Sequence, residues 1–420
     1  MKSVVLVFYQ QGMYDQSAVA IKDFFDQHIN DCEIVMVEED KFSYCYASKV
    51  SKGFYKFTAR NLPLFNRFVK GFRSKTKKKD AKQPIELQGQ TENEKTKFKR
   101  IENVLNRFSP NVVLCLTPKS HDLAIKARMT LKMDMPIYAL MTDYCLNPMF
   151  INELSDGYLV QNELLGQALQ TKGVDGNKIF ITGTPIKMVD KEYDIVALRK
   201  KYGIDNELPV VTIVGGRYGC DYVKNAVTVL VDYYQSLNLL VVTSGSNSIE
   251  NYVKTVCKNK GISQNVVMVS QPDDMYEVYA ITKVLISSPT AGVTYEAMEL
   301  CLPTVLLQPM NIIERGNYSY LTTNRIALCG ASKQELITST LNLLNNDDVY
   351  ADKVAELEDL KADVTPQVVE FLIEKANQNN KTIVVEEPPV SDELAKEQAE
   401  EPKADEKQTK KKKNKKEKND

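Results

Sequence analysis

Short apolar runs alternate with amphipathic stretches along most of the chain. Runs such as residues 4–8, 210–214 and 284–286 show no alternation of polar and apolar positions, which is typical of parallel strands that are buried on both faces. Each run is followed by a turn and then by a stretch in which apolar residues recur at helical spacing. This pattern predicts an α/β protein with parallel sheets.

The series of strands and helices starts twice. The first series runs to about Pro185, a polar helical stretch follows, and residues 210–214 open the second series. A chain of 420 residues is long enough for two domains. We therefore predict two Rossmann-like domains that face a cleft, at residues 1–186 and 187–374. Residues 375–420 hold few apolar residues and end in a lysine-rich run, which predicts a disordered charged tail.

Composition excludes several classes of protein. The net charge of −1 gives the molecule no electrostatic reason to bind nucleic acid. The eight cysteines contain no C-x-x-C pair, so we expect buried thiols in a reducing compartment and no metal site. The N-terminal apolar run is too short for a signal peptide, and no run is long enough to span a bilayer. We expect a cytoplasmic protein whose membrane contact, if any, is peripheral.

One strand–turn–helix unit has the features of a nucleotide-sugar site. The strand at residues 284–286 is followed by small turn residues at 287–292 and then by a helix. The unpaired N–H groups and the positive end of the dipole at a helix N-terminus attract anions such as phosphate. Glu296 lies about one turn into this helix, where its carboxylate could reach a hydroxyl beside a bound phosphate. Such units also occur in every α/β protein, so a purely structural role remains the alternative.

Residues 53–73 interleave aromatic residues with lysine and arginine and contain almost no acidic residue. This pattern favours insertion at a membrane–water interface, with the rings among the headgroups and the cations on anionic lipid. The equal alternative is that the aromatic residues cap the core of the first domain. The candidate membrane or acceptor residues are Phe54, Tyr55, Phe57, Arg60, Phe65, Arg67, Phe68 and Lys70.

Three stretches, at residues 142–151, 159–163 and 178–186, resemble the monogalactosyldiacylglycerol synthases and bacterial diacylglycerol glucosyltransferases, a family of MurG-like UDP-glycosyltransferases. The most specific part runs from Asp143 to Ile186 and includes the run K-I-F-I-T-G-T-P-I. The resemblance covers most of residues 1–330. It implies the GT-B fold and an enzyme that moves a hexose from a UDP-sugar to a lipid such as diacylglycerol. It also implies no cofactor and no metal bound by the protein.

The resemblance points to two candidate catalytic carboxylates. Asp143 matches the functional aspartate of the family's T-D-[YF] motif, and Asp15 stands where the family has a histidine near the acceptor. A base is needed to deprotonate the acceptor hydroxyl, and a carboxyl in an apolar cleft has its pKa raised toward neutrality. We expect Asp143 to be the base, with Asp15 second. The N-cap of a helix is an alternative role for either residue.

The resemblance also implies a UDP-sugar site. The family's glycine-rich loop lies near the phosphates, its glutamate holds the ribose hydroxyls, and its G-Q-E-x-x-N segment lies near the donor sugar. Ile313 replaces the glutamine of that segment, and the G-G-x-T before the ribose glutamate is Thr290-Ala-Gly-Val293 here, with one glycine displaced. The matching residues are Gly215, Gly216, Gly219, Thr290, Gly292, Glu296, Glu314 and Asn317.

Three functions remain open at this point. The first is a membrane-associated glycosyltransferase whose partners are a UDP-sugar donor, a lipid acceptor and an anionic membrane surface. The second is a relative that binds nucleotide or lipid without turnover, because the family's histidines are missing here. The third is a UDP-sugar epimerase with the same fold, which would have no use for the aromatic and basic segment.

Overall fold

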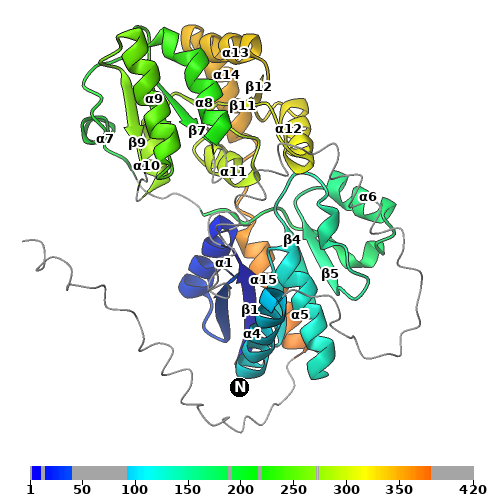
Figure 1. Cartoon of the computed structure of the whole chain (residues 1–420). Coiled ribbons are helices and arrows are strands. Elements are labelled where there is room, and N and C mark those ends of the chain that lie inside the picture. The colour runs from blue at the N-terminus through cyan, green and yellow to red at the C-terminus, as the bar shows by residue number, and fades with distance from the viewer. Residues whose placement is uncertain are drawn as a thin grey trace, which may run out of the picture. The chain divides into compact units, whose positions relative to one another are not determined.

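The structure, a computed structural model, describes residues 2–10, 15–39, 92–187, 192–215, 220–270, 272 and 274–379. Residues 1–380 form one compact unit. Its strands build two six-stranded sheets, the first from the N-terminal half of the chain and the second from the C-terminal half (Figure 1). All neighbouring strands in both sheets run parallel. The predicted α/β architecture with parallel sheets is confirmed.

The first sheet has the strand order β2-β1-β3-β4-β5-β6. Its strands are β1 (Ser3–Tyr9), β2 (Cys32–Glu38), β3 (Val112–Cys115), β4 (Ile137–Met141), β5 (Gly157–Val160) and β6 (Ile179–Ile181). The connecting helices are α1 (Asp15–His28), α4 (Glu92–Phe108), α5 (Pro118–Leu131) and α6 (Glu163–Thr171), with short 3-10 turns η2 (Pro148–Phe150) and η3 (Gly176–Lys178). The chain reverses its direction across the sheet between β1 and β3, which is where ligands bind in sheets of this kind.

The second sheet has the order β12-β11-β10-β7-β8-β9. Its strands are β7 (Val210–Val214), β8 (Asn238–Val242), β9 (Val266–Val269), β10 (Val284–Ser287), β11 (Thr304–Leu307) and β12 (Leu328–Gly330). Its helices are α7 (Ile195–Lys201), α8 (Cys220–Leu230), α9 (Asn247–Lys260), α10 (Met275–Ala280), α11 (Ala291–Glu299), α12 (Ile312–Thr323), α13 (Lys333–Asn345) and α14 (Asp347–Glu358), with η4 at Val231–Tyr233. In this sheet the chain reverses its direction between β7 and β10.

Both faces of the first sheet are covered, which explains the continuous apolar runs of its strands. Val5 and Val7 of β1 pack on one face with α1 and the last helix of the chain. Leu6 and Phe8 pack on the other face with α4 and α5. Successive side chains of a strand point to opposite faces, so a strand covered on both sides needs apolar residues at each position.

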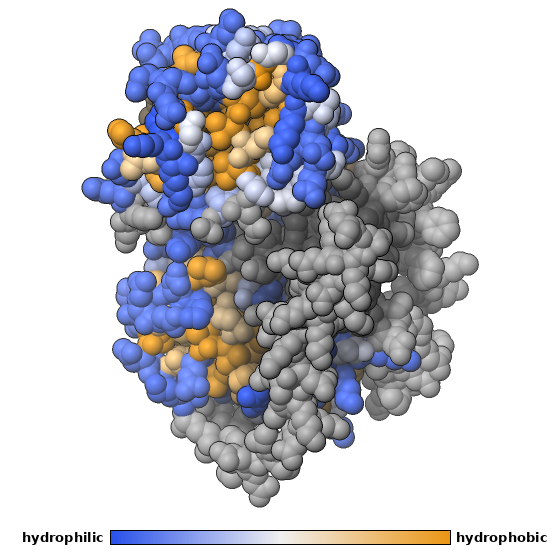
Figure 2. All heavy atoms as spheres, turned by 60° about the vertical axis from the view of Figure 1, so that its left-hand side comes forward, coloured by the Kyte–Doolittle hydropathy of each residue, from blue (hydrophilic) through white to orange (hydrophobic). Residues whose placement is uncertain are grey.

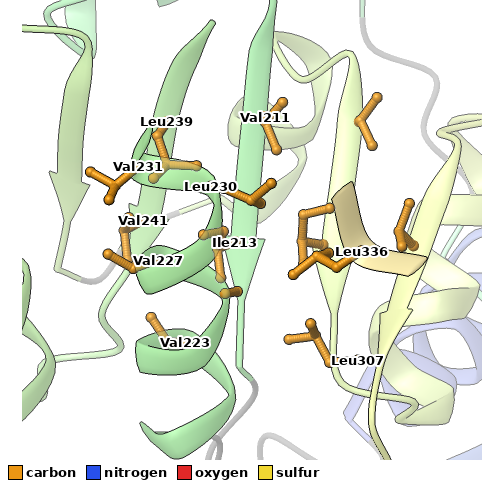
Figure 3. Close-up of a cluster of buried hydrophobic side chains, with 14 of the residues drawn as sticks. Val211, Ile213, Val223, Val227, Leu230, Val231, Leu239, Val241, Leu307 and Leu336 are labelled. Atoms are coloured by element: carbon orange, nitrogen blue, oxygen red, sulfur yellow. The ribbon is translucent and has the colours of Figure 1, made fainter. Parts of the chain in front are cut away.

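The second sheet follows the same rule. Figure 3 shows Val211 and Ile213 of β7 in one apolar cluster with Val227 of α8 and Leu336 of α13. Val210 and Val214 of β7 belong to a separate cluster on the opposite face. Each sheet therefore has its own pair of apolar layers.

The last helix, α15 (Thr365–Gln378), follows the second sheet in sequence but packs on the first. Val368, Leu372 and Ala376 are fully buried in the cluster that contains Val5 and Val7, and Figure 1 shows α15 beside β1. The predicted tail was expected to start at residue 375, yet the helix continues to Gln378 because Ala376 is buried against the sheet. The domain boundary at residues 186 and 187 stays a prediction.

The predicted membrane contact can be compared with the helices and the surface of the protein. In the part of the chain that the structure describes, no helix combines the length and apolar character needed to cross a bilayer. On the face drawn in Figure 2, areas of hydrophobic residues are bordered by hydrophilic ones. All eight candidate membrane residues between Phe54 and Lys70 lie outside the described residues, as does the tail beyond residue 379.

Candidate functional site

Residues predicted to form the site follow the carboxyl ends of strands in both sheets. Asp143 follows β4, Gly215 follows β7, and the turn at residues 288–290 follows β10. Since β7 and β10 flank the point where the second sheet reverses its direction, Gly215 and this turn lie on either side of the expected ligand crevice. The strand pattern therefore places these three segments at sheet edges where ligands bind.

Asp143 lies in an environment that suits a general base. Its Oδ1 accepts a hydrogen bond from Asn317 Nδ2 at 3.1 Å. Part of its surface is accessible, yet burial of the carboxyl raises its pKa to about 6; the Asn317 hydrogen bond lowers that pKa and the charge of Glu314 raises it. A carboxyl with such a pKa is ionised at neutral pH and more basic than an exposed one.

The alternative role of Asp143 as a helix N-cap is wrong. The next helical segment is η2, and its N-cap is Asn147, whose Oδ1 accepts a hydrogen bond from Met149 N at 3.1 Å. α1 begins at Asp15, but the side chain of Asp15 lies outside the described part of the chain. Whether Asp15 is a base or an N-cap stays a prediction.

The loop that carries Asp143 is held by side chains from α11 and α12. The Tyr144 ring stacks between Tyr295, at a centroid distance of 4.8 Å, and Tyr320, at 5.2 Å. The Tyr295 hydroxyl donates to the Thr142 carbonyl oxygen at 3.1 Å. Cys145 Sγ donates to the Ile313 carbonyl oxygen at 3.3 Å. These contacts fix the T-D-Y motif of the first half of the chain against two helices of the second half.

Glu314 and Asn317 lie close to Asp143, although they follow it by more than 170 residues. Glu314 Oε2 accepts hydrogen bonds from the Tyr222 hydroxyl and from Met310 N. Asn317 is fully buried. The structure thus brings together three residues that the resemblance had assigned to the acceptor side and to the donor side of the site.

Glu296 is held from two directions. Gln16 Nε2 of α1 donates to its Oε1 at 2.8 Å, and the Tyr279 hydroxyl of α10 donates to its Oε2 at 2.8 Å. Burial, followed by the charge of Glu296, keeps the pKa of Tyr279 well above its ordinary value, so the phenol stays a donor. The carboxylate of Glu296 is oriented in advance, as a residue that holds ribose hydroxyls needs to be.

The N-terminus of α11 carries hydroxyl groups without hydrogen-bond partners. Within the described part of the chain, the buried Ser288 Oγ and Thr290 Oγ1 make no hydrogen bond. Thr290 is the N-cap of α11 but its side chain accepts no bond from the helix. Burying an unpaired hydroxyl is costly. A ligand with acceptor oxygens at this helix end would satisfy both groups and would also meet the helix dipole.

A small pocket links these segments. Its wall includes Gln16 of α1, Thr142 after β4 and Ile186 after β6. Gly292 and Tyr295 of α11 complete it from the second half of the chain. Gly215 is buried at the end of β7, whereas Gly216 and Gly219 lie outside the described residues. The role of the glycine-rich loop therefore stays a prediction.

Sequence reasoning missed several residues that shape the site. Gln16, Tyr279 and Tyr222 orient the two glutamates, and no local signal marks them because their partners are distant in sequence. Glu39 directly follows β2 and accepts a hydrogen bond from Thr117 Oγ1 after β3. Burial raises its pKa. Its position just after an apolar run could have indicated it.

The position of His121 and the search for metal-binding side chains also bear on the chemistry. The buried His121 donates from Nδ1 to the Phe150 carbonyl oxygen at 3.1 Å, and its Nε2 forms a hydrogen bond with Ser155 Oγ at 2.9 Å. It lies in the first turn of α5, in keeping with a structural role. Among the described residues, no group of three or more histidine, cysteine and acidic side chains is placed to hold a metal ion.

Comparison with known proteins identifies the relatives of this chain. Residues 14–186 match the family model of monogalactosyldiacylglycerol (MGDG) synthase. The processive diacylglycerol beta-glucosyltransferase of Bacillus pumilus is 23% identical over 300 residues, which cover 68% of this chain and 74% of that protein. The enzyme of the same name from Staphylococcus aureus is 23% identical over 275 residues, 64% of this chain and 68% of its own. The chain is a relative of the MGDG synthases. The family predicted from the sequence is confirmed, and with it the relationship to hexose-transferring enzymes.

Solved structures show the same fold. Acinetobacter baumannii MurG matches with a TM-score of 0.56 and 12% identity, over 89% of this chain and 100% of its own. A UDP-GlcNAc 2-epimerase from Neisseria meningitidis, bound to UDP-GlcNAc, matches with a TM-score of 0.57 and 15% identity, over the same shares. Together with the two parallel sheets, these similarities confirm the GT-B fold of this MGDG synthase relative.

Proposed function

We propose that this relative of the MGDG synthases transfers a hexose from a UDP-sugar to a lipid acceptor, with diacylglycerol as the expected acceptor. The observation that carries the proposal is the N-terminus of α11, where the buried hydroxyls of Ser288 and Thr290 lack partners and precede Glu296 of the same helix. That arrangement supports a ligand with phosphate oxygens and neighbouring sugar hydroxyls. The named glucosyltransferase relatives support a donor of this class.

On the donor side, the diphosphate would lie at the N-terminus of α11 and the ribose at Glu296. The helix dipole and the unpaired N–H groups would stabilise the negative charge that develops on departing UDP. Because Gln16 and Tyr279 already hold the carboxylate of Glu296, the ribose hydroxyls would meet an oriented acceptor group. No cofactor and no metal bound by the protein enters this scheme.

On the acceptor side, Asp143 would be the general base. As the acceptor oxygen attacks the anomeric carbon, its proton passes to the carboxylate while the bond from that carbon to the UDP oxygen breaks. The pKa of about 6 supports this role, because the carboxyl is ionised at neutral pH and more basic than an exposed aspartate. Asp15, which stands where the family has a histidine, remains the second candidate.

We further propose that the protein works in the cytoplasm at an anionic membrane surface. The aromatic and basic residues between Phe54 and Lys70 support this location through their composition. Their rings suit the headgroup layer, and their cations suit anionic lipid.

The test is sugar transfer to diacylglycerol in vesicles that contain an anionic lipid, with UDP-glucose, UDP-galactose and UDP-GlcNAc offered separately. We expect a glycolipid product from at least one donor and its loss in Asp143→Asn. Asp205→Asn, at an exposed position, is the matched control and should keep wild-type activity. Vesicles without anionic lipid should give less product.

Two outcomes would contradict the proposal. UDP binding without product from any donor would favour the reading of a non-catalytic relative. Conversion of UDP-GlcNAc to its epimer without any lipid would favour the epimerase reading, which the shared fold also permits.

A further inference from the structure

Asn317 occupies a central place between the two halves of the site. Its side chain is fully buried on α12. Its Nδ2 donates to Asp143 Oδ1 at 3.1 Å and to the Pro289 carbonyl oxygen at 3.3 Å. Its Oδ1 accepts from Tyr144 N at 2.9 Å. One amide thus joins the loop after β4, the turn after β10 and the helix α12.

The contacts with Asp143 and Pro289 use both N–H donors of the Asn317 amide. A side-chain amide offers two N–H donors and one carbonyl oxygen, and both N–H groups of Asn317 are engaged with protein oxygens. A sugar hydroxyl could accept a hydrogen bond from Asn317 only if one of these contacts broke. The family resemblance places this asparagine near the donor sugar, but its hydrogen bonds are directed to the Asp143 loop.

Neighbouring contacts hold α12 and the loop in register. A Cβ added at Gly316 would come within 2.5 Å of Cys145 Cβ, so only glycine allows this approach. Cys145 Sγ donates to the Ile313 carbonyl oxygen at 3.3 Å. With the helix docked so closely, Asn317 meets Asp143 at a fixed position. The bond engages Oδ1, and no hydrogen bond to Oδ2 is found among the described residues.

We propose that Asn317 is a positioning residue, which fixes the orientation and the ionisation of Asp143 and leaves Oδ2 directed to the acceptor hydroxyl. Its contribution to sugar transfer would run through Asp143 and not through contact with the donor sugar. The catalytic part of this inference rests on the proposed function, whereas the effect on the ionisation of Asp143 does not.

A pH test of this proposal depends on which charged and titratable groups surround Asp143. Glu314 from α12 is the acidic neighbour, and its charge raises the pKa of Asp143. Cys145 and Tyr144 from the same loop and Tyr295 from α11 have pKa values raised by burial, Cys145 to about 12, so they stay neutral between pH 5 and 9. The hydrogen bond from Asn317 opposes burial and lowers the pKa of Asp143. Its loss should move that pKa upward.

The experiment compares Asn317→Ala and Asn317→Asp with the wild type. Asn317→Asp keeps the volume and an oxygen for Tyr144 N, but once ionised it has no donor for Asp143 and adds a like charge that also raises the pKa of Asp143. Asn324→Ala is the matched control, because Asn324 caps the same helix at its exposed end. The readouts are the pH dependence of kcat for glycolipid formation between pH 5 and 9 and the KM for the UDP-sugar.

We expect the acidic limb of the kcat profile to move to higher pH in both Asn317 variants, with kcat at pH 6.5 lowered at least tenfold. The KM for the UDP-sugar should change less than threefold, and Asn324→Ala should match the wild type. In an Asp143→Asn background, Asn317→Ala should lower the residual rate less than twofold, because residues that act through each other are not additive. A raised KM with an unchanged acidic limb would overturn the proposal.

A second measurement does not need turnover. The difference in thermal stability between a protein and its Asp143→Asn variant reports the titration of Asp143. Measured between pH 4 and 8, its midpoint should lie at higher pH in the Asn317→Ala background, which adds no titratable group, than in the wild type. An unchanged midpoint would overturn the inference even in an active enzyme. Absence of transfer with a shifted midpoint would refute the proposed function and leave the positioning of Asp143 supported.

Discussion

Replacing Asp143 by asparagine should stabilise the protein at pH 8 while it lowers sugar transfer to a small residual rate. Burial raises the pKa of this carboxyl from its ordinary value of 3.8 to about 6, so the folded protein holds a charge there at a cost. This difference between the pKa of the folded protein and the ordinary pKa corresponds to at most about 3 kcal/mol of stability. An asparagine keeps the shape and an oxygen for Asn317 Nδ2 but carries no charge.

The stability gained in Asp143→Asn should increase with pH. Between 3.8 and about 6 the folded state binds more protons than the unfolded state, so the stability of the wild type falls as the pH rises through this window. Above about pH 7 the loss is complete. Asp143→Asn should therefore exceed the wild type by the full amount at pH 8, by roughly half of it at pH 5, and by little near pH 4.

The assay is thermal and urea unfolding of both proteins at pH 4, 5 and 8, with Asp205→Asn as a control at an exposed carboxylate. A gain of about 3 kcal/mol would raise the Tm by roughly 4 °C, because the entropy of unfolding scales with the size of the compact unit of residues 1–380. A variant that is no more stable than the wild type at pH 8 would refute the claim that Asp143 is held ionised at a cost. A gain of the same size at pH 4 and pH 8 would refute the charge as its cause.

Three further predictions concern other parts of the structure. Glu296→Gln should weaken UDP binding about tenfold in calorimetry, because a charged acceptor for ribose hydroxyls is lost; unchanged affinity would remove Glu296 from the nucleotide site. Gly316→Ala should lower the free energy of unfolding by about 1–3 kcal/mol, since its Cβ would meet Cys145 Sγ at 2.4 Å, and adding Cys145→Gly should restore most of the loss in urea unfolding. Leu372→Ala, in α15, should cost about 2–5 kcal/mol in the same assay, whereas Leu360→Ala at an exposed position should cost little; equal effects would contradict the packing of α15 on the first sheet.

The sequence by itself determined the elements and the edge of each sheet at which a ligand is expected. Apolar runs such as that of β7 predict buried parallel strands because both faces of each sheet are covered. The ligand-binding edge follows from the order of strands and helices, since parallel strands end at the same side of a sheet. Small residues before α11 and a glutamate one turn into it were visible as local signals.

Only the tertiary structure decided which side chains meet. Asp143 and Asn317 are separated by 174 positions, and Gln16 and Glu296 by 280. No local pattern encodes such pairs, because they depend on how two sheets and their helices dock. The same holds for α15, whose apolar face could have covered either sheet but packs beside β1. The pKa of Asp143 is likewise a property of its neighbours: burial, the Asn317 amide and the charge of Glu314 set it together, and all three come from the folded chain.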